Sequence, residues 1–230
     1  MKIKVLGTRG EIEESAPYHS KKSGVLIDNK ILLDIGDKQF LKYKPQHILV
    51  THLHPDHAYF VRDKKPLLAN IPIYVPEKYE QFDIHITKKP FKINNYLITP
   101  IPTIHSIKAK SNAYLIEHKK ICILYTGDLI WIEKKYHKLL RNLDLVITEA
   151  SFIRKGGLIR RNKQTDEIYG HTGVPNLINL FKKLTNKILF IHFGAWFYKD
   201  IKKARKNIQK LAKENDIEII VGYDGLEITV

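Results

Sequence analysis

The sequence predicts an α/β fold in which two β-sheet layers pack together and helices cover the outside. Three observations lead to this prediction. The first half of the 230-residue chain consists of short β-rich runs separated by turn residues. In the second half, strand-like apolar runs alternate with segments that have the spacing of amphipathic helices. No linker rich in Ser, Pro or Gly and no repeat divides the sequence, so we expect residues 1–230 to form one domain.

Strands are expected where apolar and β-branched residues cluster between turn-forming residues. Asp28 and Asn29 form a favourable hairpin turn between the second and third of these runs. The expected strands are residues 3–6, 24–28, 30–34, 47–51, 71–75, 96–102, 113–117, 121–125, 143–148, 187–192, 217–221 and 226–230.

Two helices are expected, over about residues 174–184 and about residues 200–214. The start of the first is marked by Thr172 as a candidate cap and by Pro175 in the first turn. The second carries apolar side chains on one face and lysines elsewhere, which is typical of a helix with a solvated face. The longest nearly apolar stretch is shorter than the ~18 residues that span a bilayer, so no membrane-spanning helix is expected.

The composition bounds the class of protein. The 39 Lys and Arg residues against 24 Asp and Glu give a net charge of +15, which suggests anionic substrates or partners. The Lys enrichment of hyperthermophile proteins would explain the same charge. The hydrophobic content of 43% excludes intrinsic disorder of the whole chain. Cys122 is the single cysteine, and the N-terminal residues lack the apolar core of a secretory signal, so a cytoplasmic location is expected.

The strongest chemical signal follows the expected strand at residues 47–51. His52, His54, Asp56 and His57 stand within six residues, with Pro55 making a turn among them. Imidazole and carboxylate groups bind divalent metal ions, and four such donors at the end of a buried strand can serve two ions rather than one. Three further candidates each end an apolar run: His105, Asp128 and His192.

This ordered pattern of His-X-His-X-Asp-His, then His, Asp and His, resembles the metallo-β-lactamase superfamily over almost the whole chain. The residues 5–8 and 31–36 are similar to the first strands of that superfamily. The resemblance implies a four-layer αββα sandwich with a dinuclear metal site between the sheet edges. It implies that His52, His54 and His105 bind one metal, that Asp56, His57 and His192 bind the other, and that Asp128 bridges the two. Such ligands favour Zn²⁺, although Mn²⁺ and Fe accept them too.

Three later segments narrow the resemblance to the ribonuclease Z branch of the superfamily. They are Glu-Ala-Ser-Phe from Glu149, Gly-His-Thr-Gly around His171 and Phe-Ile-His-Phe-Gly around His192. The resemblance implies that His171 serves phosphodiester cleavage, where an alkoxide leaving group needs a proton donor. Glu149 could orient His171 through its other ring nitrogen. The alternatives are a helix-start histidine bonded to the backbone and a simple surface carboxylate.

The function expected from these residues is that of a dinuclear metal-dependent phosphodiesterase acting on RNA, another nucleic acid or a cyclic nucleotide-like ester. In the expected mechanism, a metal-bridging hydroxide attacks phosphorus in line and His171 protonates the leaving oxygen. Asp56 would hold a metal and take the proton of the hydroxide.

Residues 154–163 carry five cations in a segment expected to be a glycine-containing loop. Arg160 and Arg161 are the candidates for a phosphate clamp on an anionic substrate, and a merely solvated charge run is the equal alternative. Trp196, Phe197 and Tyr198 could stack a base, although packing residues are the more common reading of such a run.

The sequence departs from the ribonuclease Z pattern in places. Only 128 − 105 − 1 = 22 residues separate His105 from Asp128, which is too short for the long arm that many members insert there to grip tRNA. Ala58 replaces the glycine usual after the first motif, and Gly194 with residues 195–198 replaces the usual Ser and Arg. These departures favour a compact phosphodiesterase for cyclic nucleotide-like esters or short nucleic acids over a tRNA-processing enzyme.

Two other functions fit parts of the sequence. One is an acyl hydrolase of the same fold, acting on a lactone or thioester, in which His171 is structural. The other is a basic nucleic-acid-binding protein with an idle metal site. A redox di-iron role fits less well, because His54 stands where a carboxylate would be expected. A homodimer is an expectation by analogy with the family alone.

Overall fold

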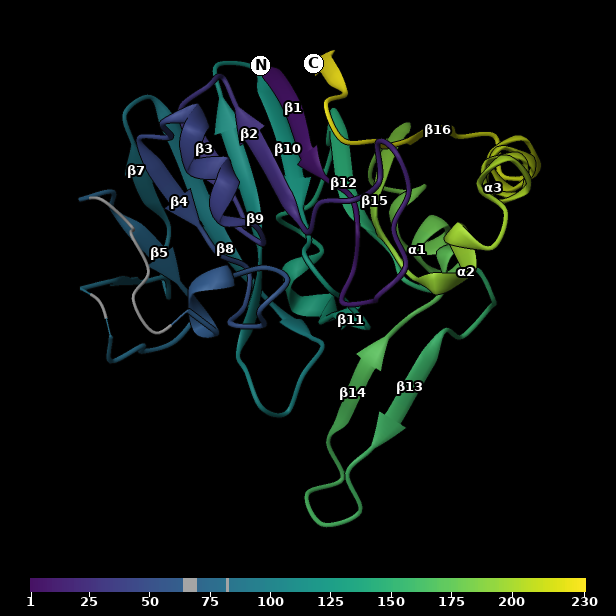
Figure 1. Ribbon diagram of the computed structural model, residues 1–230, viewed down its shortest axis with the longest axis horizontal. Helices are drawn as coiled ribbons and strands as arrows, with labels where there is room; N and C mark the ends of the chain where they lie inside the picture. The colour runs from purple at the N-terminus through teal and green to yellow at the C-terminus, as the bar shows by residue number, and fades with distance from the viewer. Residues whose placement is uncertain (64–69, 82) are drawn as a thin grey trace.

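Two β-sheets lie face to face in the computed structural model, which describes residues 1–63, 70–81 and 83–230 (Figure 1). The first sheet contains, in spatial order, β17 (Glu227–Thr229), β1 (Lys2–Gly7), β2 (Gly24–Ile27), β3 (Ile31–Leu33), β4 (His47–Leu49), β5 (Ile73–Val75) and β6 (His85–Ile86). The second contains β11 (Trp131–Ile132), β8 (Tyr96–Ile104), β9 (Ser111–His118), β10 (Ile121–Tyr125), β12 (Leu145–Ala150), β15 (Lys187–Phe193) and β16 (Glu218–Val221). A further strand, β7 (Phe91–Ile93), pairs with β8.

The central strands are apolar on both faces because each sheet is covered on both sides. In β2, Val25 and Ile27 face the second sheet, whereas Leu26 belongs to the cluster on the outer side. That outer side is covered by the short helices η1 (Lys38–Tyr43) and η2 (Tyr59–Val61), through the buried rings of Phe40 and Phe60. Burying each ring contributes roughly 1.5–3 kcal/mol.

The outer face of the second sheet is covered by α1 (Val174–Phe181), α2 (Ala195–Tyr198) and α3 (Ile201–Glu214). The predicted αββα sandwich is therefore confirmed, with one difference. In the part of the chain that the structure describes, the helical layer on the first sheet is built from 3-10 turns instead of α-helices.

A third short helix, η3 (Lys134–Tyr136), follows β11. The predicted cap at Thr172 is wrong, because Gly173 is the residue that precedes α1, and the backbone N–H of Thr172 donates to Leu129 O, 3.0 Å away. At α3, Asp200 caps the helix by accepting from Lys203 N. Among the described residues, no helix is long and apolar enough to cross a membrane.

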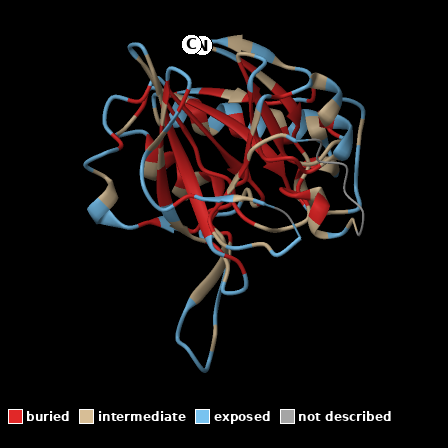
Figure 2. Ribbon diagram, turned by 90° about the vertical axis from the view of Figure 1, so that its left-hand side faces the viewer, coloured by how far each residue is buried: buried red, intermediate tan, exposed pale blue. Residues whose placement is uncertain are grey.

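The segment predicted as a basic loop is instead part of a β-hairpin. Strand β13 (Leu158–Arg161) pairs antiparallel with β14 (Ile168–His171), and the pair projects from the body of the molecule (Figures 1 and 2). Gly170, with φ +122°, allows this pairing, since a Cβ there would lie 2.1 Å from Leu158 O. The loop prediction was wrong at residues 158–161 because a two-stranded hairpin buries little, and its apolar alternation is correspondingly weak.

The segment between β1 and β2, residues 8–23 and here called the β1–β2 loop, is fastened to the second sheet. Phe193 N donates to Thr8 O at 2.7 Å, and Gly10 N donates to Phe193 O at 3.1 Å. The buried Asp224 accepts from the Thr8 hydroxyl at 2.9 Å and from backbone N–H groups of the same loop. These bonds hold the loop beside the end of β15.

One buried histidine of this loop predicts a pH dependence of stability. Burial, with the nearby Arg205 guanidinium, lowers the pKa of His19 from 6.5 to about 4. The unfolded chain therefore binds a proton more readily than the native protein, so stability is full at neutral pH and falls as the pH drops through 6.5 towards 4. Between pH 7 and pH 5, the free energy of unfolding should fall about 1 kcal/mol more in the wild type than in His19→Gln, allowing for partial solvent screening. Urea titrations at both pH values measure this, and equal losses in the two proteins would contradict it.

Candidate metal centre

The structure brings all seven predicted metal ligands together at one edge of the two sheets. Both sheets contribute: the first motif follows β4, whereas the later donors lie within a strand of the second sheet or in the segments that follow its strands. The donors are His52, His54, Asp56, His57, His105, Asp128 and His192. In each of the two groups that they form, the candidate ligand atoms lie within 4.8 Å of one another.

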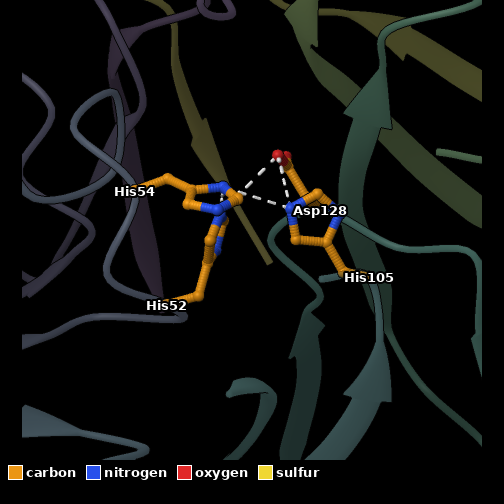
Figure 3. A group of neighbouring side chains, drawn as sticks. All are labelled: His52, His54, His105 and Asp128. Atoms are coloured by element: carbon orange, nitrogen blue, oxygen red, sulfur yellow. Dashed lines mark hydrogen bonds and ion pairs between the residues drawn. The ribbon is translucent and has the colours of Figure 1, made fainter. Parts of the chain in front are cut away.

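The first group consists of three imidazoles and one carboxylate (Figure 3). His54 Nδ1 lies 3.0 Å from His52 Nε2 and 3.3 Å from His105 Nε2. Asp128 Oδ2 lies 3.8 Å from His52 Nε2 and 3.6 Å from His105 Nε2. Ligand atoms on a tetrahedral zinc ion with bonds of about 2.0–2.1 Å are about 3.3 Å apart, so the spacing of these four atoms suits such an ion.

The second group consists of two imidazoles and two carboxylates. His192 Nε2 lies 2.9 Å from Asp56 Oδ2 and 3.3 Å from Asp128 Oδ1. His57 Nε2 lies 3.2 Å from Asp128 Oδ1 and 3.7 Å from Asp56 Oδ2. Asp128 thus offers one oxygen to each group, which is the arrangement of a bridging ligand.

Two backbone irregularities aim ligands into the centre. Gly127 has φ +59°, and a Cβ on it would lie 2.5 Å from Thr51 Oγ1, so only glycine lets Asp128 approach the first motif. His192 is the extra residue of a β-bulge, because Glu149 of β12 pairs with Ile191 and the next residue pairs with Phe193. Its φ of +52° is strained for a non-glycine residue, and the bulge re-aims its ring towards Asp56.

A buried carboxylate that the sequence analysis did not single out orients the first motif. Asp34 Oδ2 accepts from His57 Nδ1 at 2.7 Å and from Tyr125 OH at 2.8 Å. Asp34 also accepts from the backbone and hydroxyl of Thr51, whose Oγ1 lies 3.1 Å from His52 Nδ1. One acid therefore fixes the ring orientation of two histidines. The signal that could have found it is a carboxylate directly after the fully apolar run Ile31–Leu33.

Two further histidines of the centre, His105 and His192, also point Nε2 towards the other donors and have a partner at Nδ1. His105 Nδ1 donates to Gly170 O at 2.9 Å, and His192 Nδ1 lies 3.1 Å from Ser151 Oγ. Partners of this kind fix the tautomer and the ring orientation of metal-binding histidines.

The residues fit a pair of divalent cations. His57 Nε2 and Asp128 Oδ1 are buried and, among the described residues, form no hydrogen bond, although they lie only 3.2 Å apart. Burial lowers the pKa of His52 well below its usual value, which favours the neutral ring that binds a metal. Around His57, burial is outweighed by the carboxylates of Asp128 and Asp34, which raise its pKa. A divalent cation matches the positive charge that these carboxylates require.

His171 and Glu149 form a third group with Asp128, at the open side of the centre. His171 Nδ1 lies 2.8 Å from Glu149 Oε2, and the other oxygen of Glu149 accepts from Leu129 N at 2.6 Å. Burial opposes a charge on His171, but the carboxylates of Glu149 and Asp128 outweigh it and raise its pKa to about 9. Glu149 is fully buried, so the alternative of a surface carboxylate is wrong. His171 ends β14 and does not start a helix.

A cavity of about 390 Å³ opens over the metal centre. Its polar wall consists of His54, Asp56, His105, Asp128, Ser151, His171 and His192. Its apolar wall comes from the β1–β2 loop, through Ile12, and from Phe152, Leu158, Ala195 and Trp196. In the described part of the chain, Glu11 is the one charged residue of the lining outside the groups above, and no Lys or Arg contributes to it.

The structure does not bring the two candidate substrate arginines to this cavity. Arg160 and Arg161 are exposed on β13, and neither lines the cavity. Arg161 Nη1 pairs with Asp166 Oδ2 across the hairpin at 2.7 Å. Of the aromatic run, Trp196 lines the cavity, whereas Phe197 is buried in the core and Tyr198 OH donates to His19 O.

The sequence model of a beta-lactamase superfamily domain matches residues 22–151, more than half of the chain. The chain belongs to the metallo-β-lactamase superfamily. The match spans the donors from His52 to Asp128 and also Glu149, while His171 and His192 lie beyond it. The protein is thus a metal-dependent hydrolase of this fold. Comparison with curated protein sequences gives no significant match.

Solved structures with the same fold cover nearly the whole chain. The metallo-β-lactamase fold protein YhfI from Bacillus subtilis has a TM-score of 0.71 and 18% identity, covering 99% of this chain and 98% of its own. A diphosphatase from the PhnP family has a TM-score of 0.67 and 19% identity, with coverages of 100% and 97%. The short form of human tRNase Z has a TM-score of 0.65 and 17% identity, with coverages of 100% and 99%. At these identities, the likeness establishes the fold.

Removal of the Asp34 carboxylate tests its orienting role. Asp34→Asn should weaken metal binding about 10- to 100-fold, because His57 loses a charged acceptor and Thr51 is released. Competition with a chromophoric chelator measures the affinity. The matched control is Asp144→Asn, which removes an exposed carboxylate that accepts from Cys122 N away from the centre. Equal affinities of Asp34→Asn and the control would show that Asp34 does not orient the ligands.

Proposed function

We propose that the protein is a dinuclear metal-dependent phosphodiesterase. The observation that carries the proposal is the His171–Glu149 pair, a proton donor held at 2.8 Å by a buried carboxylate and facing the same cavity as the metal centre. Hydrolysis of a phosphodiester expels an alkoxide, which needs such a donor. Two similar structures, named a diphosphatase and a tRNase Z, support the choice of a phosphate ester.

The metal ligands are the two groups described above, with Asp128 shared between them. Two divalent cations, for which this ligand set favours Zn²⁺ over Mn²⁺ or Fe, would supply Lewis acidity towards the phosphoryl oxygens and lower the pKa of water. The Asp56 carboxylate lines the cavity beside His192, so it is placed both to hold a metal and to accept a proton from the attacking water.

The proton for the leaving oxygen comes from His171. Glu149 occupies its Nδ1, so Nε2–H is the donor left for the substrate. Leu129 N fixes the other oxygen of Glu149, which keeps the carboxylate from turning away. Glu149 is therefore a positioning residue that also stabilises the positive charge on the ring before the transfer.

One observation favours a second candidate, hydrolysis of an acyl ester such as a lactone or thioester. The described lining of the cavity contains no Lys or Arg and is largely apolar. Without Lys or Arg in this lining, the negative charge of a phosphodiester would be neutralised by the metal ions alone. Parallel assays with bis(p-nitrophenyl) phosphate and p-nitrophenyl acetate separate the two candidates.

His171→Ala should abolish most diester hydrolysis without loss of metal. On a dinucleoside phosphate, whose leaving group is an alkoxide, we expect kcat to fall about 100-fold or more. On bis(p-nitrophenyl) phosphate the loss should be smaller, because a nitrophenolate leaves with little protonation. Elemental analysis of the purified variant verifies that both metal ions are retained.

His118→Ala, which removes a histidine on β9 outside the metal centre, is the control and should keep wild-type turnover. If His171→Ala hydrolysed the dinucleoside phosphate at the wild-type rate with full metal occupancy, His171 would not be the proton donor.

The basic hairpin gives a separate prediction about long substrates. We propose that Arg160 and Arg161 contact an anionic strand outside the cavity. In Arg160→Gln/Arg161→Gln, the slope of log affinity for an RNA against log salt should become about 1.4 shallower, since each phosphate contact on a single strand contributes about 0.7. The Michaelis constant for bis(p-nitrophenyl) phosphate should not change. The control is Lys202→Gln/Lys206→Gln on the exposed face of α3. If the salt dependence of RNA affinity had the same slope in both variants, Arg160 and Arg161 would not contact the RNA.

A further inference from the structure

A second cavity, of about 480 Å³, lies beside the β1–β2 loop and outside the metal centre. It is lined by Pro17, Tyr18, His19, Ile201, Arg205 and Tyr223. Its volume is in the range of about 300–1,000 Å³ that small-molecule sites occupy. None of these six residues belongs to the metal groups or to the His171–Glu149 pair.

Two tyrosine rings form an exposed wall of this cavity. Tyr18 is 71% exposed and Tyr223 is 38% exposed, with ring centroids 6.4 Å apart and ring planes at 88°. Tyr18 has φ +64°, a left-handed conformation that is rare for a bulky residue. Asp224 N donates to Tyr18 O at 2.7 Å and holds this conformation. This hydrogen bond fixes the backbone that carries the exposed ring of Tyr18 beside Tyr223.

Arg205 adds a fixed planar cation to the wall. Its Nη1 donates to Val221 O and its Nη2 to Gly222 O, each at 3.3 Å, and Nη2 also lies 3.3 Å from His19 Nε2. These contacts fix the plane of the guanidinium at its edge, and Arg205 lines the cavity. Nucleobases stack on aromatic rings and on arginine planes, and the charge of arginine also attracts phosphate.

The two cavities are built from the same pair of segments. The β1–β2 loop contributes Gly10, Glu11 and Ile12 to the metal-centre cavity and its residues 17–19 to the second one. The segment of α2 and α3 contributes Ala195 and Trp196 to the first and Ile201 and Arg205 to the second. Tyr198 OH donates to His19 O at 3.0 Å and joins the segments between the cavities, where Figure 1 shows the loop near α2. Residues 12–17 in the loop and residues 196–201 in the helical segment each run from one lining to the other. Six residues span at most about 20 Å, so one short single strand of nucleic acid can reach both cavities.

We propose that the second cavity is a subsite for a nucleobase of the substrate, so that the substrate class is single-stranded nucleic acid. The proposal rests on the phosphodiesterase function above. The scissile diester lies at the metal centre, and a base further along the strand stacks against Tyr18, Tyr223 and the guanidinium of Arg205. A cyclic mononucleotide fills the first cavity only and leaves these aromatic residues without a role.

The test compares a ligand that spans both cavities with one that occupies the first alone. Binding of a fluorescein-labelled, phosphorothioate-linked octanucleotide to the metal-loaded protein is measured by anisotropy, and turnover of bis(p-nitrophenyl) phosphate is measured in parallel. Tyr18→Ala and Tyr223→Ala should each weaken octanucleotide binding about tenfold, the loss of one stacked base. Tyr18→Phe and Tyr223→Phe should bind as the wild type does, because stacking needs the ring and not the hydroxyl.

Diester turnover should be unchanged in all four variants. Tyr43→Ala, which removes a tyrosine of η1 on the outer side of the first sheet, should leave both octanucleotide binding and diester turnover unchanged.

The subsite is overturned if the alanine variants bind the octanucleotide normally, or if they lose diester turnover to the same degree. It is also overturned if light scattering shows that the tyrosines hold two copies together. Wild-type protein that hydrolyses no diester but binds the octanucleotide through these tyrosines would refute the proposed function and support the subsite. Wild-type protein that hydrolyses the diester but binds the octanucleotide without these tyrosines would support the proposed function and refute the subsite.

Discussion

The buried carboxylate of Asp128 is the group around which the two sheets are arranged. Its oxygens lie 3.2–3.9 Å from ring nitrogens of His52, His57, His105, His171 and His192. An ionised carboxylate removed from water costs several kcal/mol unless opposite charge and hydrogen-bond donors surround it. Those partners come from β4, β8, β14 and β15 or the turns after them, so the edges of both sheets must meet at this point. The strained backbone at His192 persists because the converging side chains compensate for it, whereas glycine adopts the positive φ at position 127 without strain.

Much of this arrangement could be predicted from the sequence because it depends on local signals. Apolar runs bounded by turn residues located the strands, and polar residues that end such runs located the donors. His52, His105 and Asp128 needed no knowledge of strand order, since ligands that follow different strands gather wherever those strand ends share an edge. The helices α1 and α3 were also predicted, because their apolar side chains have helical spacing, whereas the short helices η1, η2 and α2 were not.

The remaining features depend on pairing across the fold. Asp34 looks like an ordinary strand-end residue until two distant donors are seen to reach it: His57, from the turn after β4, and Tyr125, at the end of β10. The β13–β14 hairpin was missed because neither strand buries an apolar face. The second cavity was missed because Tyr18 is separated from Arg205 and Tyr223 by most of the length of the chain. Charge composition carries no information about position, and in the described residues no Lys or Arg lines the metal-centre cavity.

The base and the tip of the β13–β14 hairpin differ in how strongly the rest of the fold constrains them. Its base is joined to the candidate metal ligand His105 by two hydrogen bonds. His105 Nδ1 donates to Gly170 O, and Gly170 N donates to His105 O at 2.7 Å. A slip of one residue in the β13–β14 register would turn the His171 ring to the opposite face and place a Cβ against Leu158 O. The tip, residues 162–167, is exposed at most positions and is free of these constraints. The length or charge of the tip could therefore change without disturbing the β13–β14 register at its base.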